Sequence, residues 1–73
     1  MNDELILKNR LRVARAEKNI SQGELARMVG VSRQTISSLE NGRYNPSILL
    51  AYRIAKYFGM TIEEVFVFEE EEA

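Results

Sequence analysis

Apolar residues recur every three or four positions along most of the chain, which is the spacing that puts them on one face of an α-helix. Polar and charged residues fill most of the positions between them. The inward faces predicted by this spacing are Leu11, Ala14 and Ile20 in one segment, Leu25, Ala26 and Val29 in a second, Ile36 and Leu39 in a third, and Ile48, Ala51, Ala55 and Phe58 in a fourth. The pattern therefore predicts a bundle of short amphipathic helices.

Residues that begin and end helices lie between these apolar series. Ser21 precedes Glu24 by three residues, and Thr61 precedes Glu64 by the same interval. Each pair predicts a capping box, in which a side chain and the backbone hydrogen-bond reciprocally at a helix start. Glycine readily adopts a positive φ and so closes helices, and three glycines follow the apolar series: Gly30, Gly42 and Gly59. These signals divide the chain into separate helices.

Five helices follow from the periodicity and the end signals. We place them at about Lys8 to Lys18, Ser21 to Val29, Ser32 to Asn41, Ser47 to Phe58 and Thr61 to Phe66. Pro46 also marks the start of the fourth helix, since proline in a first turn gives up an N–H group that has no partner there. The stretches 5–7 (LIL) and 65–68 (VFVF) favour short β-strands, and we expect them to pair. The sequence predicts an all-α fold in one domain, residues 1–73.

Residues 21–42 predict two short helices joined by a tight turn. Gly30 permits the turn, and the small side chain of Ala26 suits the place where the two helices cross. The apolar residues that would anchor the second helix on the core are Val31, Ile36 and Leu39. This arrangement is helix-turn-helix geometry, in which the second helix enters the major groove of DNA.

The outward face of the second helix carries polar side chains suited to base recognition. At about 100° per residue, one continuous arc without apolar or acidic side chains holds Arg33, Gln34, Ser37, Ser38 and Asn41. An arginine can donate two hydrogen bonds to guanine, and a glutamine can pair with adenine. We therefore expect this arc to contact base edges.

The net charge of −1 hides an uneven distribution along the chain. All ten Lys and Arg residues lie between Lys8 and Lys56, where only Glu17, Glu24 and Glu40 oppose them, so that this part carries a net charge of about +7. Such a basic body favours a polyanionic partner, because cations that neutralise phosphates release condensed counterions. The sequence thus predicts binding to double-stranded DNA.

The acidic residues outside this segment include the run of glutamates at 69–72. We interpret the acidic tail, residues 69–73, as a solvating end that discourages aggregation of an edge strand. The alternative is a docking strip that imitates the charge of DNA.

The composition excludes several classes of function. The chain has no cysteine and no histidine, so disulfides, thiolate or imidazole metal sites and catalysis by Cys or His are excluded. We expect no metal, no cofactor, no small-molecule ligand and no enzymatic activity. No apolar run approaches the roughly 20 residues that cross a bilayer, and the first residues lack the basic flank of a secretory signal. We therefore expect a cytoplasmic, nucleoid-associated protein without a membrane partner.

The segment from about Leu11 to Phe66 resembles the Cro/C1-type helix-turn-helix domains, also called the XRE family. The resemblance lies in the runs SQGELARMVGVSRQTISSLENGR, NPSI and IAKYFGMTIEEVF. It implies a five-helix, lambda-repressor-like bundle that binds operator DNA as a two-fold dimer. Within the family the chain is similar to the minimal stand-alone regulators, which lack a ligand domain and carry terminal strands that form a small antiparallel sheet.

The resemblance also implies roles for individual side chains. Arg33 and Gln34 match the first recognition-helix positions that read bases, and Ser37 and Ser38 match later ones. The positions that usually hold the DNA backbone are matched by Gln22, Thr35, Asn41, Arg43, Tyr44 and Asn45. Gln22 lies at a helix start, where backbone N–H groups already favour a phosphate.

Two further expectations concern stability and assembly. Arg15 and Glu40 match a pair that often forms a partly buried ion pair between the first and third helices. A core of this size is only marginally stable alone, which favours self-association. Four apolar residues exceed what one small core needs, and we assign them to a homodimer interface: Leu49, Leu50, Val67 and Phe68.

The sequence thus predicts a sequence-specific DNA-binding transcriptional regulator of the repressor type. We expect it to bind a pseudo-palindromic operator as a homodimer through the recognition helix at 32–41. The alternative is an antitoxin-like or phage-control protein whose primary partner is another protein. The basic surface from Arg33 to Arg43 favours the DNA-binding interpretation.

Overall fold

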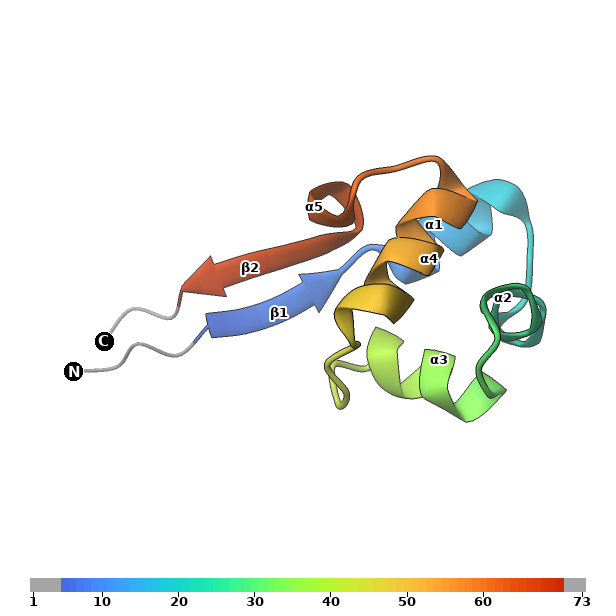
Figure 1. Cartoon of the computed structure of the whole chain (residues 1–73), viewed down its shortest axis with the longest axis horizontal. Helices are drawn as coiled ribbons and strands as arrows, with labels where there is room; N and C mark the ends of the chain where they lie inside the picture. Colours follow the sequence, from blue (N-terminus) through green and yellow to red (C-terminus); the bar gives the residue numbers. More distant parts are fainter. Residues whose placement is uncertain (1–4, 71–73) are drawn as a thin grey trace.

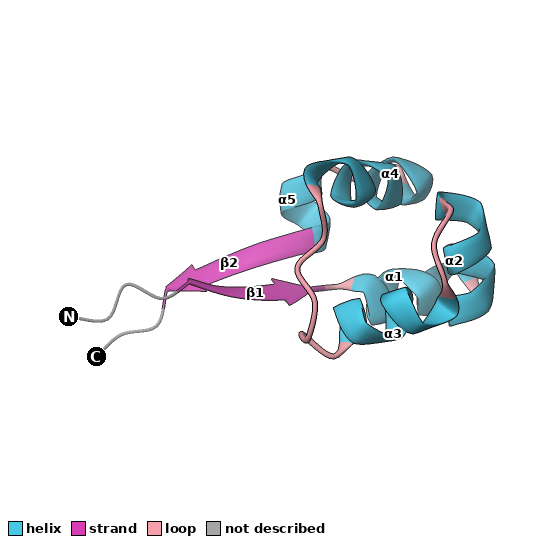
Figure 2. Ribbon diagram, turned by 60° about the horizontal axis from the view of Figure 1, so that its bottom comes forward, coloured by secondary structure: helices cyan, strands magenta, loops and turns pink. Residues whose placement is uncertain are grey.

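The computed structural model describes residues 5–70 and shows five helices with one two-stranded antiparallel sheet, as the sequence predicts (Figure 1). The order is β1 Leu5–Asn9, α1 Leu11–Lys18, α2 Gln22–Val29, α3 Arg33–Glu40, α4 Ile48–Phe58, α5 Ile62–Val65 and β2 Phe66–Glu70. The helices surround the core, whereas the β1–β2 ribbon extends away from them (Figure 2). The ribbon accounts for the longest dimension of the molecule, 41 Å against 22 and 21 Å.

Both predicted capping boxes form. The Ser21 hydroxyl accepts a hydrogen bond from the backbone N–H of Glu24, whose carboxylate in turn accepts from the N–H of Ser21. Thr61 and Glu64 exchange the same pair of bonds at the start of α5. Because a capping box uses only residues within one turn, it could be predicted without knowledge of the tertiary structure.

Residues in the left-handed conformation cap the ends of α1, α2 and α4. Gly30 and Gly59 close α2 and α4 with φ angles of 81° and 68°, and Gly42 follows α3 with φ 73°. Asn19 closes α1 in the same conformation, with φ 57°. Asparagine tolerates this region better than most other residues with a Cβ, so Asn19 is the residue in the sequence that signals the end of α1.

Pairing between the strands corrects the predicted start of the first helix. Lys8 and Asn9 are the last residues of β1, opposite Val67 and Phe66 of β2, and α1 begins only at Leu11. The prediction of a helix from Lys8 was therefore wrong, because hydrogen bonding across the sheet outweighs local helical periodicity. The same pairing places Phe66 in β2 rather than at the end of α5.

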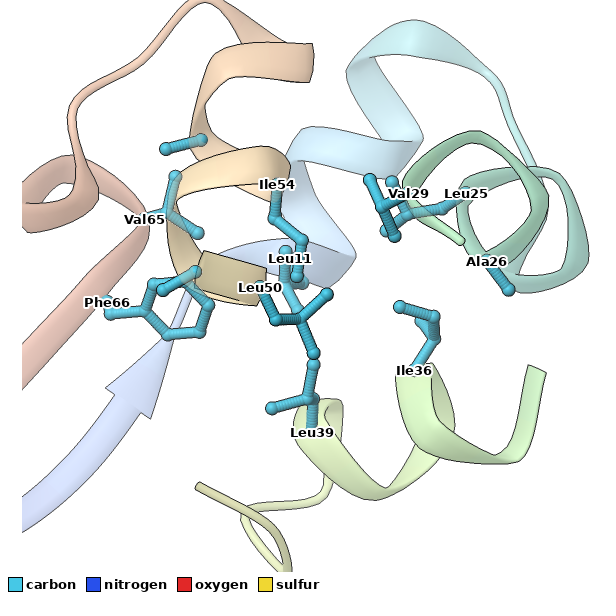
Figure 3. Close-up of a cluster of buried hydrophobic side chains, with 12 residues drawn as sticks. Leu11, Leu25, Ala26, Val29, Ile36, Leu39, Leu50, Ile54, Val65 and Phe66 are labelled. Carbon is cyan, nitrogen blue, oxygen red and sulfur yellow. The ribbon is translucent and has the colours of Figure 1, made fainter. Parts of the chain in front are cut away.

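The core lies between the helices and the base of the ribbon. Figure 3 shows side chains from all five helices meeting there, together with Phe66 of β2. The buried cluster consists of Leu11, Leu25, Ala26, Val29, Ile36, Leu39, Leu50, Ala51, Ile54, Ala55, Val65 and Phe66.

The first turn of α4 differs from the prediction. Ser47 caps this helix by accepting from the N–H of Leu50, so Pro46 lies before the cap and not in the first turn. Ile48, predicted to face inward, is 83% exposed, whereas Leu50 is 6% exposed and belongs to the core. Leu50 is therefore not available to a dimer interface. Four consecutive apolar residues begin α4, and periodicity alone did not show which of them face the core.

Candidate nucleic-acid interface

A tight turn sets α3 against α2. The N–H groups of Gly30 and Val31 both donate to the carbonyl of Ala26, at 2.9 and 3.0 Å, and so turn the chain immediately after α2. Ile36 and Leu39 then point from α3 into the core (Figure 3). Because these two side chains fix one side of α3 on the bundle, the opposite side of the helix faces solvent.

The outward side of α3 is polar. Arg33, Gln34 and Asn41 are exposed, and Ser37 and Ser38 are half-buried beside them. The five residues thus lie on the arc that helical spacing predicts, and the two serines are less exposed than the other three residues. The small serine side chains next to the long ones of Arg33 and Gln34 leave room for the edge of a base pair.

The residues next to this arc occupy two places. Thr35 is half-buried, and its hydroxyl lies 3.0 Å from that of Ser32, which caps α3. Arg43, Tyr44 and Asn45 are exposed in the loop between α3 and α4. This loop places a cation and an aromatic side chain just beyond the C-terminal end of α3.

The ion pair predicted between α1 and α3 is present. The Arg15 guanidinium donates from Nε and Nη2 to the two carboxylate oxygens of Glu40, at 2.6 and 3.0 Å. Its remaining terminal nitrogen donates to the carbonyl of Ile20 at 3.0 Å. The Glu40 side chain is only 1% exposed and that of Arg15 16%, so water screens this bond little.

Two more side chains converge on Glu40. Gln22, at the start of α2, donates from Nε2 to Glu40 Oε1 at 3.0 Å and accepts from Arg33 Nη1 at 3.3 Å. Arg12 lies 3.6 Å from the same carboxylate and donates to the Asn41 side chain at 3.4 Å. The sequence interpretation did not include Arg12, although its position three residues before Arg15 puts both on one face of α1.

The surroundings of Glu40 shift its ionisation. Burial acts to raise the pKa of this carboxyl, but the hydrogen bonds from Arg15 and Gln22, together with the charges of Arg15 and Arg12, lower the pKa below its ordinary value of 4.5. The hydrogen bond to Glu40 likewise raises the pKa of Arg15 against the effect of burial. Both groups are charged at neutral pH.

This lowered pKa makes stability dependent on pH. Because the folded pKa of Glu40 lies below the unfolded one, its charge stabilises the fold above about pH 4.5, and the contribution is lost as the pH falls through the folded pKa. We expect the free energy of unfolding of the wild type to converge on that of the Glu40→Gln variant as the pH falls from 5 to about 2. Urea unfolding of both proteins across this range measures the difference. A difference that does not change with pH would contradict the assignment.

The described part of the chain, residues 5–70, holds no cluster of three or more acidic, Cys or His side chains that could bind a metal ion. It also contains no helix with the length and apolar character needed to span a membrane.

A family model described as Helix-turn-helix matches residues 11–65, from the start of α1 to the end of α5. The chain belongs to this family of Cro/C1-type regulators. It is 50% identical over 66 residues to an uncharacterized HTH-type transcriptional regulator of Methanocaldococcus jannaschii, and the match covers 90% of this chain and all of the relative. The family consists of DNA-binding transcriptional regulators and not of enzymes.

Solved structures of related regulators share this fold. The P22 c2 repressor in complex with a synthetic operator superposes with a TM-score of 0.71 at 30% identity, covering 74% of this chain and 82% of the repressor. The restriction-modification controller protein C.AhdI from Aeromonas hydrophila gives 0.69 at 31% identity, covering 75% and 80% of the two chains. The chain is therefore a helix-turn-helix regulator with a repressor-like bundle.

Proposed function

We propose that this regulator binds a pseudo-palindromic operator as a homodimer and acts as a repressor, with α3 of each protomer in one major groove. The observation that carries the proposal is the composition of the exposed side of α3. Its exposed residues include Arg33, Gln34 and Asn41, while Glu40, the one acidic residue of the helix, is buried against Arg15. A helix surface without exposed acid can approach the phosphates and place its side chains on base edges.

The side chains divide into two groups under this proposal. Those on the outward arc read bases: Arg33, Gln34, Ser37 and Ser38. The fifth residue of the arc, Asn41, and residues near the two ends of α3 hold the DNA backbone, so that this group consists of Gln22, Thr35, Asn41, Arg43, Tyr44 and Asn45. The position of the second group supports the division, because Gln22 contacts the start of α3 through Arg33 and the exposed loop residues follow its end. Contacts at both ends fix the register of the helix in the groove.

Selection of bound duplexes from a random pool tests sequence-specific binding. We expect the selected duplexes to contain two inverted half-sites whose centres lie about 34 Å apart. Their binding constant should fall steeply with salt concentration, because each neutralised phosphate releases a counterion. A pool that shows no enrichment at low salt would contradict the proposal.

Dimer formation has a candidate surface at the start of α4 and on β2. We define this apolar surface by the exposed Ile48, Leu49 and Phe68, with the half-buried Val67. Ile48 and Phe68 both line a hollow between α4, α5 and β2, so the two elements form one continuous surface. The hollow is also lined by Pro46 and Ser47, which follow the loop after α3. A two-fold dimer through this surface would relate the two recognition helices by its symmetry axis.

Placing a charge on this surface is expected to separate the protomers. Leu49→Glu should convert a dimer into a monomer because a carboxylate would be buried at the interface. Val13→Glu is a matched control, because Val13 on α1 is as exposed as Leu49, at 58%. Sedimentation equilibrium at micromolar concentration reports the mass of each variant. A monomeric wild type, or equal effects of both variants, would contradict the proposed interface.

A further inference from the structure

We propose that Glu40 is a positioning residue for base recognition: through the side-chain amide of Gln22, it holds the Arg33 guanidinium in place at the start of the recognition helix. The inference rests on the proposed function, because it assigns a partner to one of the base-reading side chains. Glu40 itself does not reach the DNA, since its side chain is buried under α1.

An unbroken series of hydrogen bonds connects the two residues. Arg15 holds both oxygens of the Glu40 carboxylate, and Oε1 of that carboxylate also accepts from Nε2 of Gln22 at 3.0 Å. The other end of the Gln22 amide, Oε1, accepts from Nη1 of Arg33 at 3.3 Å. The series runs outward, from the buried Glu40 through the half-buried Gln22 to the exposed Arg33.

The charge of Glu40 decides which way the amide points. A carboxylate can only accept hydrogen bonds and a guanidinium can only donate them. If the amide of Gln22 were reversed, its oxygen would face the Glu40 carboxylate and its NH2 group would face Arg33, so both bonds would be lost. The buried charge therefore turns the amide oxygen toward Arg33, and Gln22 transmits this preference from the interior to the surface.

The backbone at the start of α2 helps to define the position of Arg33. Gln22 is the first residue of the helix, and the capping box of Ser21 fixes that turn. The aliphatic stem of Arg33 passes beside Gly23, where a Cβ would lie 3.8 Å from Arg33 Cδ. A long side chain held in this way loses less conformational freedom when it binds a base than a free one would.

A double-mutant cycle tests this inference in DNA binding. Arg33→Ala first identifies the base pair whose discrimination depends on Arg33. Glu40→Gln removes the charge at nearly constant shape, and we expect it to reduce discrimination at that same pair by about fivefold. In the Arg33→Ala background the Glu40→Gln change should have no further effect on that pair, because Glu40 acts only through Arg33. An unchanged discrimination, or an effect that persists without Arg33, would overturn the inference.

A control separates this effect from loss of stability. Ile54→Val makes a small cavity in the core on α4, a helix that supplies none of the hydrogen-bonding partners of Glu40, and should lower the melting temperature without changing base discrimination. All variants are compared at a temperature at which circular dichroism shows each of them to be folded. If Ile54→Val reduced discrimination at the same base pair, the effect of Glu40→Gln would be one of stability and the inference would fall.

The free protein provides a test that does not depend on DNA. Nuclear magnetic resonance should show slower exchange with water for the side-chain NH2 protons of Gln22 than for those of Gln34, an exposed glutamine on α3. Glu40→Gln should remove this difference and shift the Arg33 Nε–H signal. Equal exchange rates in the wild type would overturn the inference. Failure to bind any duplex, with the Gln22 and Arg33 signals as expected, would reject the proposed function and leave the positioning of Arg33 by Glu40 supported.

Discussion

Replacing Arg15 by methionine is expected to lower the free energy of unfolding by about 3–5 kcal/mol, because the change leaves a buried carboxylate without its main partner. Arg12 lies 3.6 Å from the same carboxylate of Glu40, but its mostly exposed guanidinium is a weak replacement because water screens the interaction. Since domains of this size are stable by only about 5–15 kcal/mol, the variant would lose a large part of its stability. Urea unfolding at neutral pH measures the loss.

The double variant Arg15→Met with Glu40→Met is the control for this prediction. It replaces both charges by apolar side chains, and we expect its stability to lie within about 1 kcal/mol of the wild type. In the single variant, burial without a partner would raise the pKa of Glu40, so that its stability relative to the double variant should increase as the pH falls. A single variant as stable as the wild type at pH 7 would show that the ion pair contributes little.

Replacing Arg33 by alanine is expected to weaken operator binding by about 1–3 kcal/mol, and most of the loss should fall on one base pair of each half-site. Arg43→Ala should instead weaken binding to every sequence alike, because the loop that carries Arg43 is proposed to meet phosphates and not bases. The binding constant of this variant should also depend less steeply on salt concentration, because about one counterion fewer is released on binding.

Competition binding against a set of operators with single base-pair changes distinguishes these two results. The wild type provides the reference profile, and the same measurement at several salt concentrations provides the slope. If Arg43→Ala changed the preference at one base pair and Arg33→Ala affected all sequences equally, the two assigned roles would have to be exchanged.

The helix boundaries that could be predicted from the sequence are those that depend on neighbouring residues. Ser21 with Glu24, and Gly30 at the end of α2, act within one or two turns of the chain, and the structure confirms them. The start of α1 could not be found in this way, because the pairing of Asn9 with Phe66 connects residues more than fifty positions apart. A local pattern holds no information about such a partner.

The parts of the candidate site that could be predicted are likewise those that depend on residues close in sequence. Helical spacing alone places Arg33 and Gln34 on the outward side of α3, where the structure has them exposed. The contacts of Gln22 with Glu40 and Arg33 join the start of α2 to both ends of α3, and no spacing within one helix predicts that α2 and α3 meet in this way. The sequence therefore predicted the surface of the site and the Arg15–Glu40 ion pair, but not the contact of Gln22 that connects this pair to Arg33.

The antiparallel pairing of β1 with β2 also bears on how the molecule is made. β1 leaves the ribosome before all five helices and β2 leaves it after them, so the ribbon cannot close until residues 66–70 have emerged from the exit tunnel. The contacts between α2 and α3 are close in sequence and can form while synthesis continues, because short loops close with little loss of entropy. During translation, the helix-turn-helix can thus take shape before β1 and β2 pair.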